Sequence, residues 1–244
     1  MKVTVVGYWG GYPGVNEATS GYLFEHEGFR LLVDCGSGVL AQLQNYIEIS
    51  ELDAVIISHY HHDHIADIGP LQYARLISNY LNKSSNNLPI YGHEEDLVAF
   101  SKLTYKNITS SEAYIPEQVL HIGPFAITFM KTKHPAICYA MRIVAGEHTI
   151  VFTGDSSYVE GFIPFSVNAD LLICECNLYG DQEGAEMGHM NSIEAGKIAE
   201  EAKVKNLLLT HLPHYGNHEI LQHEAASIFN GNLFLARQGF IFEP

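Results

Sequence analysis

The stretch His59-Tyr60-His61-His62-Asp63-His64 is the part of the sequence that decides the fold. The apolar segment Ala54-Val55-Ile56-Ile57 lies just before it and predicts a buried β-strand. A polar cluster at the carboxyl end of a core strand is where α/β folds place their ligand sites. The alternative is a histidine-rich surface loop, and the rest of the chain argues against that alternative by supplying further ligands.

The spacing within this stretch predicts ligands for two metal ions. His59 and His61 are two positions apart, so on an extended backbone their side chains point to the same side. Asp63 and His64 are adjacent, so we expect them to diverge and to suit a second metal ion. Imidazole and carboxylate ligands favour zinc, manganese or iron.

Length and composition set the outer limits. The chain has 244 residues, a length that fits one large domain or two closely packed halves, and 47% of its residues are apolar, enough for a sizeable core. We expect residues 1–244 to form a single domain. No apolar run approaches the ~20 residues of a transmembrane helix. The apolar start, residues 1–6, is too short for a secretory signal and predicts the first strand instead. A cytoplasmic protein is therefore expected.

The charge balance argues against a general nucleic-acid binder. Lys and Arg number 13 against 28 Asp and Glu, which gives a net charge of −15 with neutral histidine. This lowers the chance of a large polyanionic substrate without excluding one. Among the four cysteines, Cys174 and Cys176 lie in an apolar segment and are expected in the core.

Apolar periodicity predicts two successive groups of strands and helices. The expected strands span residues 3–6, 20–24, 29–33, 54–58 and 90–92, then 125–130, 139–144, 149–152, 171–174, 207–209, 233–235 and 239–242. The expected helices span residues 39–46, 65–82, 96–104, 192–202 and 219–228, with a polar loop over 83–87 and Ser192 as an N-cap. Strands then helices, twice over, predict an α/β fold of two packed sheets with helices outside.

Three further candidate ligands stand at the ends of predicted strands. His134 follows the strand 125–130 after a short polar link, Asp155 follows the apolar segment 150–152, and His211 follows the segment 207–209. Each alone is an ordinary loop residue. Their recurrence at strand ends after the histidine cluster predicts that they complete its ligand set.

With these residues in place, the chain resembles the metallo-β-lactamase-fold hydrolases. The H-x-H-x-D-H motif of that family stands as His59, His61, Asp63 and His64, and its later motifs as His134, Asp155 and His211, in the family's order. The resemblance covers nearly the whole chain. It implies a four-layer αββα sandwich with two metal ions in a cleft between the sheets.

The resemblance also implies how the ligands are shared. One ion is expected on His59, His61 and His134, the other on Asp63, His64 and His211, with Asp155 bridging both. Asp34 matches an early Asp that braces the histidine loop from behind the ligands. The expected cofactors are two divalent ions, with zinc favoured over manganese. Such a pair activates a bridging water for attack on phosphorus or on a carbonyl carbon.

A second motif indicates the branch of the family. The segment Gly188-His189-Met190-Asn191-Ser192 resembles one found in ribonuclease Z-like and cyclic-phosphate phosphodiesterases, where the His lies beside the metals. Glu175 matches a Glu of the same branch and is expected to hold His189. The candidate catalytic residues are therefore Asp63, His189 and Glu175. The plain alternatives are a solvent-exposed loop histidine and a structural carboxylate.

Two departures from that branch narrow the range of possible substrates. His134 and Asp155 lie only 21 positions apart, which leaves room for a hairpin but not for the long arm of transfer-RNA-processing enzymes. The Gly-rich first-strand signature is altered to Gly7-Tyr8-Trp9-Gly10-Gly11-Tyr12-Pro13-Gly14, an aromatic loop that either lines the substrate site or covers a sheet edge.

The sequence therefore predicts a phosphodiester substrate, either a small linear or cyclic molecule or an RNA 3′ end, and no membrane partner. A carboxylic-ester hydrolase, such as a lactonase or thioesterase, is the enzymatic alternative. A metal-bound binding or scaffold module is the non-enzymatic alternative, and a homodimer stays open.

Overall fold

The computed structural model describes residues 1–81 and 87–244. The chain divides into two compact units. Unit 1 comprises Met1–Ile115, Ile122–Pro124 and Gln238–Glu243, and unit 2 comprises Pro116–His121, Phe125–Arg237 and Pro244. Each unit holds one sheet and its helices, whereas the single-domain organisation stays a prediction.

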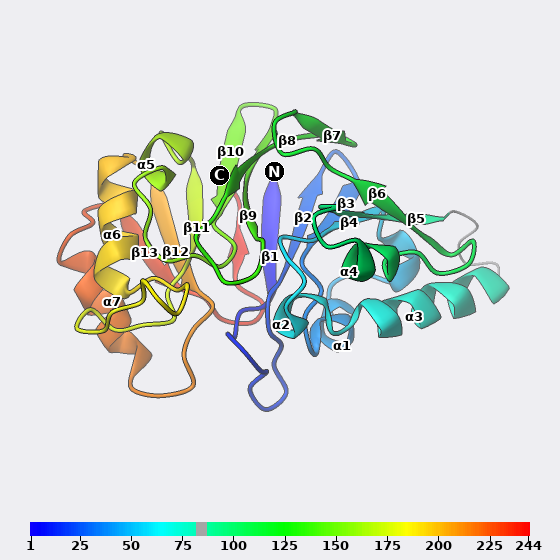
Figure 1. Ribbon diagram of the computed structural model, residues 1–244, viewed down its shortest axis with the longest axis horizontal. Coiled ribbons are helices and arrows are strands. Elements are labelled where there is room, and N and C mark those ends of the chain that lie inside the picture. The colour runs from blue at the N-terminus through cyan, green and yellow to red at the C-terminus, as the bar shows by residue number, and fades with distance from the viewer. Residues whose placement is uncertain (82–86) are drawn as a thin grey trace. The chain divides into compact units, whose positions relative to one another are not determined.

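Unit 1 is built on a seven-stranded mixed sheet in the order β14-β1-β2-β3-β4-β5-β6 (Figure 1). Its strands are β1 (Lys2–Gly7), β2 (Gly21–His26), β3 (Phe29–Val33), β4 (Ala54–Ile56), β5 (Leu88–Gly92), β6 (Thr109–Ala113) and β14 (Ile241–Phe242). Neighbours from β14 to β3 pair antiparallel, and those from β3 to β6 pair parallel.

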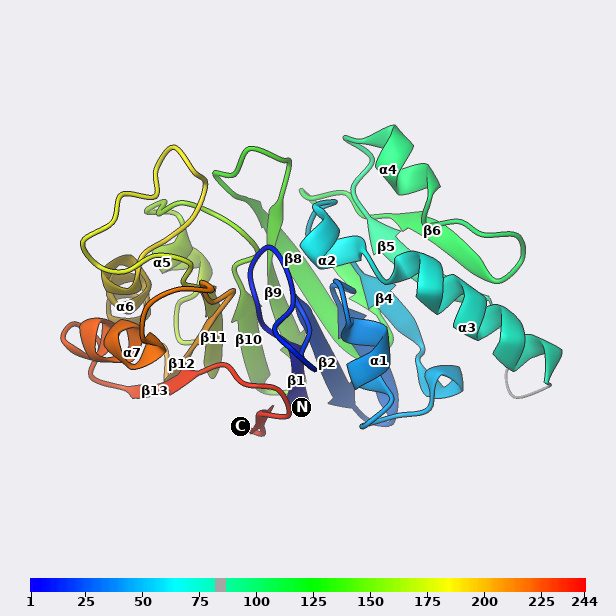
Figure 2. The same cartoon turned by 90° about the horizontal axis from the view of Figure 1, so that it is seen from below.

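Short helices complete unit 1. They are α1 (Val39–Leu43), the 3-10 helix η1 (Ile49–Glu51), α2 (His62–Ile65), α3 (Ile68–Tyr80) and α4 (Leu97–Ser101). Figure 2 shows α1 and α3 on one face of the sheet. Leu43 of α1 and Leu71 of α3 are fully buried there with Leu32 of β3 and Val55 of β4, so the apolar stripes of the helices cover the apolar side of these strands.

Unit 2 has a second seven-stranded mixed sheet, in the order β13-β12-β11-β10-β9-β8-β7. Its strands are β7 (Leu120–Ile122), β8 (Phe125–Lys131), β9 (Tyr139–Ala145), β10 (His148–Phe152), β11 (Leu171–Glu175), β12 (Asn206–Thr210) and β13 (Asn232–Leu235). Its helices are α5 (Phe162–Phe165), α6 (Ser192–Glu201) and α7 (His218–Ala226). Helix α6 packs on β11, β12 and α7, and α7 packs on β13.

Strand direction decides where the candidate residues come together within each unit. In unit 2, β10, β11 and β12 are mutually parallel, and β8 runs the same way because two antiparallel pairings separate it from β10. In unit 1, β1, β3 and β4 share a direction for the same reason. The loops that follow these strands therefore emerge at one edge of each sheet.

The structure confirms the predicted α/β class and most elements, with several corrections. Strands β6 and β7 and helices α2 and α5 were not predicted, and α1 ends at Leu43 rather than at 46. The N-cap of α6 is Asn191, whose side chain accepts the Glu194 N–H, so the Ser192 assignment is wrong. The predicted end of a helix at residue 82 and most of the polar loop 83–87 lie outside the described residues.

Within the described residues, no helix is long and apolar enough to cross a membrane.

Candidate functional site

Four of the predicted metal ligands lie on the loop and helix that follow β4 in unit 1. The rings of His59 and His61 lie 4.8 Å apart, centroid to centroid, and His61 has the extended backbone that precedes α2. The expectation that Asp63 and His64 diverge is wrong, because Asp63 Oδ2 lies 3.7 Å from His64 Nε2. Both residues lie on the single turn of α2, where successive side chains are about 100° apart and not on opposite sides as in a strand.

Asp34, which directly follows β3, braces this loop from within the core. Its Oδ1 accepts the Ser58 N–H at 2.8 Å, and its Oδ2 accepts the Ser58 hydroxyl at 3.0 Å and the Ser20 hydroxyl at 2.9 Å. The same Oδ2 lies 2.6 Å from His64 Nδ1. Asp34 is fully buried and adopts a left-handed backbone with φ 58°, a conformation that Asp tolerates better than most residues.

These contacts fix which ring nitrogen each histidine presents. Since the Asp34 carboxylate only accepts, His64 Nδ1 is the donor, which makes Nε2 the lone-pair nitrogen of the neutral ring. The Ser58 hydroxyl donates to Asp34, so it accepts from His59 Nδ1 at 3.1 Å. Metal-binding histidines have this arrangement, with one nitrogen held by an oxygen and the other left to the ion.

Unit 2 gathers the other three predicted ligands at the edge where β8, β10 and β12 end. Asp155 Oδ2 lies 3.3 Å from His211 Nε2 and 4.0 Å from His134 Nε2. His134 Nδ1 donates to the Gly188 carbonyl at 2.9 Å, which again presents Nε2. A carboxylate oxygen between two imidazole nitrogens is a donor set that suits a divalent ion.

Two close supports hold these histidines. A Cβ on Gly188 would lie 2.8 Å from His134 Nδ1, so only glycine allows the carbonyl this approach. The Asn177 side-chain amide donates to the His211 carbonyl at 2.9 Å, where the His211 backbone has φ 52°. A left-handed histidine is unfavourable in isolation, and such conformations cluster at functional sites.

Glu175 and His189 form a second cluster beside His211. Glu175 Oε1 accepts from His189 Nδ1 at 3.0 Å and from the Ser156 N–H at 2.6 Å, while Oε2 accepts the Met190 N–H at 3.1 Å. The His189 ring stacks on His211 with centroids 5.2 Å apart. Because backbone amides engage both oxygens of Glu175, its carboxylate suits orienting His189 better than binding an ion.

The nearby cysteines belong to the core, as predicted. Cys174 and Cys176 are fully buried. Burial, with Glu175 nearby, raises the pKa of both thiols well above its ordinary value, so they stay protonated and are poor metal ligands.

Sequence reasoning singled out Asp34 and Glu175 but missed the other residues that orient the candidate ligands. Ser58 was visible as a hydroxyl directly before His59, and the Gly188 carbonyl lies in the segment that was singled out for His189. Asn177 and Ser20 gave no signal, because their roles depend on contacts with residues far away in the chain.

The chain as a whole is similar to known proteins. A family model described as a beta-lactamase superfamily domain matches residues 29–212. The probable metallo-hydrolase YhfI of Bacillus subtilis is 59% identical over 243 residues, covering 100% of each chain. The crystal structure of YhfI matches with a TM-score of 0.99 over 100% of this chain and 99% of that one.

Two solved structures with lower identity share the fold. Human tRNase Z, short form, is 22% identical with a TM-score of 0.77 and covers 100% of this chain and 99% of its own. A diphosphatase from the PhnP family is 16% identical with a TM-score of 0.78 and covers 100% and 97%. The metallo-β-lactamase fold predicted from the sequence is thereby confirmed.

Proposed function

Since the chain belongs to the beta-lactamase superfamily, we propose that it is a metal-dependent hydrolase that cleaves phosphodiester bonds. The observation that carries the phosphodiester assignment is the Glu175–His189 hydrogen bond beside His211. It gives the site a positioned imidazole in addition to the metal ligands.

Each unit carries a set of the proposed metal ligands. Unit 1 supplies His59, His61, Asp63 and His64, and unit 2 supplies His134, Asp155 and His211. The hydrogen bonds at Nδ1 of His59, His64 and His134 fit them to this role, because they leave Nε2 to coordinate. When bound, two divalent ions, with zinc favoured, supply an activated water and charge neutralisation at the scissile group.

His189 has the proposed role of proton donor to the leaving oxygen. Its Nδ1 donates to Glu175, so a proton on Nε2 is the one that it can transfer. The Glu175 carboxylate stabilises the cationic ring before the transfer and holds its orientation, while Ser156 and Met190 hold the carboxylate. The proposed role of Asp63 is to bind one of the metal ions at which the reaction takes place.

The proposed substrate is a small linear or cyclic phosphodiester, or the 3′ end of an RNA. Two features favour the small molecule. The segment between His134 and Asp155 is the β9–β10 hairpin and not a protruding arm, and the net charge of −15 disfavours a long polyanion. The names of the tRNase Z and of the diphosphatase agree with phosphorus chemistry in general.

The test is His189→Ala assayed on phosphodiesters with good and poor leaving groups. We expect kcat to fall by about 10²–10⁴-fold, the usual contribution of a positioned acid, with metal content and fold unchanged. The loss in kcat should be smaller for p-nitrophenyl phosphodiesters, since their leaving group needs little protonation.

The matched control is His121→Ala, an exposed histidine of β7, which should behave as wild type. Equal losses on good and poor leaving groups would remove the acid role and leave phosphate orientation. Unchanged kinetics on every substrate would overturn the assignment to this branch.

A further inference from the structure

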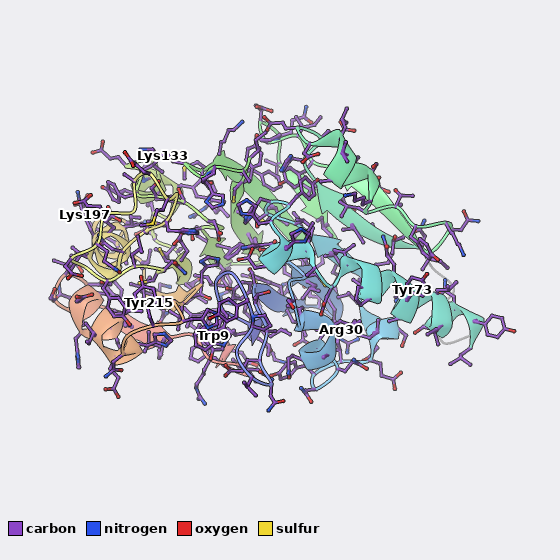
Figure 3. All side chains as sticks on the ribbon, turned by 60° about the horizontal axis from the view of Figure 1, so that its bottom comes forward. Trp9, Arg30, Tyr73, Lys133, Lys197 and Tyr215 are labelled. Carbon is purple, nitrogen blue, oxygen red and sulfur yellow. The ribbon has the colours of Figure 1, made fainter. Side chains whose placement is uncertain are left out.

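The aromatic loop after β1, residues 8–14, contacts one of the proposed metal ligands within unit 1. The Gly11 N–H donates to Asp63 Oδ2 at 2.8 Å. Figure 3 labels Trp9 on this loop. The sequence left open whether the loop lines the substrate site or covers a sheet edge, and this hydrogen bond gives it a third role, in orienting a ligand.

The backbone and the carboxylate of Asp63 are held by different segments. The Asp63 carbonyl accepts the Ser20 N–H at 3.1 Å. A Cβ on Gly36 would lie 1.9 Å from the same carbonyl, so the chain packs closely there. The loop amide of Gly11 acts instead on the carboxylate itself and restrains its rotation.

Glu17 holds the loop in place through two aromatic side chains. Its Oε1 accepts the Tyr8 hydroxyl at 2.9 Å, and its Oε2 accepts the Trp9 indole N–H at 2.6 Å. The two rings stack with centroids 5.1 Å apart. Hydrogen bonds to an ionised carboxylate are roughly twice as strong as neutral ones, so one side chain fixes two successive residues.

Backbone hydrogen bonds close the loop at Glu17 and at its neighbour Ala18. The Glu17 N–H donates to the Gly14 carbonyl at 3.1 Å, and the Tyr8 and Trp9 amides both point to the Ala18 carbonyl, at 3.0 Å and 3.3 Å. A Cβ on Gly14 would lie 2.5 Å from Glu17 Oε2 and 2.7 Å from Trp9 Nε1. The loop therefore packs directly against the bonded pair.

We propose that Glu17 is a positioning residue for the metal ligand Asp63, acting through Tyr8, Trp9 and the Gly11 amide. The inference rests on the proposed function, because it takes Asp63 as a ligand. It makes metal affinity depend on a carboxylate that is itself no ligand. It also predicts that the environment of Trp9 changes when the ion binds.

Tryptophan fluorescence gives a direct readout, since Trp9 is the one tryptophan among the 244 residues. Zinc titrated into the metal-free wild-type protein should change Trp9 emission and its quenching by acrylamide. In Glu17→Gln, where an amide replaces the double acceptor, the metal-free protein should be quenched more readily and the zinc-dependent change should be lost.

Metal affinity is the second readout, by chelator competition with zinc. Glu17→Gln should bind one of the two ions about 10–100-fold more weakly, the usual effect of removing a group that orients a ligand. The control Glu27→Gln makes the same charge change at the exposed β2–β3 turn and should bind as wild type does. A folded Glu17→Gln protein with wild-type affinity and wild-type fluorescence response overturns the proposal.

The double variant Tyr8→Phe/Trp9→Phe removes both donors and leaves Glu17 in place. It should weaken zinc binding as much as Glu17→Gln does, and adding Glu17→Gln should cost nothing further. This variant also answers the question if Glu17→Gln does not fold. Full additivity would show that Glu17 acts by another route and would overturn the proposal.

Asp63→Asn separates this inference from the proposed function. Wild-type binding of both ions by Asp63→Asn would overturn the two together. Weak binding by Asp63→Asn with wild-type binding by Glu17→Gln would overturn this inference alone.

Discussion

Asp34 shows how much of the site is decided by residues that are not ligands. A single buried carboxylate accepts from Ser20, Ser58 and His64. Through Ser58 it also determines the donor nitrogen of His59. Glu175 has a comparable role in unit 2, where its carboxylate accepts hydrogen bonds from His189 and from two backbone amides.

Replacing Asp34 by Asn should weaken metal binding while keeping the backbone, since Asn also tolerates the left-handed conformation. The amide has one acceptor oxygen where the carboxylate has two, so a donor among Ser20, Ser58 and His64 loses its partner. We expect zinc affinity to fall by about 10–100-fold in a chelator-competition titration. Asp53→Asn, at an exposed residue that accepts the Arg30 N–H, is the control. Equal affinities in the two variants would contradict the bracing role.

Glu175→Gln should lower both stability and turnover. Its amide cannot accept from Ser156, Met190 and His189 at once, and a buried donor without its acceptor costs about 1–3 kcal/mol. The free energy of unfolding should fall by that amount in a denaturant titration, and kcat should approach that of His189→Ala. A variant with wild-type kcat would show that Glu175 is only structural.

At the scale of elements, a pair of exposed glycines separates backbone conformation from packing. A Cβ on Gly28 or on Gly69 would meet no atom within 4 Å, but Gly28 has φ +82° in the β2–β3 turn whereas Gly69 is helical, in α3. Gly28→Ala should therefore cost about 1–2 kcal/mol of unfolding free energy. Gly69→Ala should cost less than that, because Gly69 has a negative φ, although Pro70 disfavours a helical backbone at a preceding residue with a Cβ. Thermal unfolding of both variants compares the two costs, and a larger loss for Gly69→Ala would be inconsistent with this explanation.

The elements also show what sequence patterns can and cannot predict. Strands such as β3 and β10 were predicted because their apolar runs stand out locally. Strand β6, Thr-Ser-Ser-Glu-Ala, was missed because it has no apolar run and ends in Glu and Ala, which are depleted in strands, so its pairing with β5 supplies the structure. Helix α2 was missed because it is only four residues long and two of them, Asp63 and His64, were interpreted as ligands on a loop.

The candidate site divides in the same way. The candidate ligands were identifiable because they follow predicted strands in a recognisable motif. The hydrogen bonds from Tyr8 and Trp9 to Glu17 could not be predicted, because they depend on how an irregular loop returns to the sheet. The convergence of Asp63 and His64 was misjudged because an extended backbone was assumed where the chain forms a helical turn.

For the whole molecule, metal removal should lower thermal stability. An ion that binds only the folded chain at about 1,000 times its Kd adds about 4 kcal/mol. At ~2–4 °C per kcal/mol for a chain of this size, a chelator should lower Tm by roughly 8–16 °C per ion. Scanning calorimetry before and after dialysis against a chelator measures the shift. Zinc should restore Tm, and an unchanged Tm would argue against tightly bound ions.

The central claim, metal-dependent hydrolysis of phosphodiesters, is tested most directly by one comparison of kcat/KM. A single zinc-replete preparation, with its metal content measured, is assayed on bis(p-nitrophenyl) phosphate, cyclic nucleotides, precursor transfer RNA, lactones and thioesters. The account predicts two ions per chain. It also predicts that kcat/KM for a small phosphodiester is well above the values for every lactone and thioester. A lactone or thioester turned over faster than any phosphodiester would contradict it.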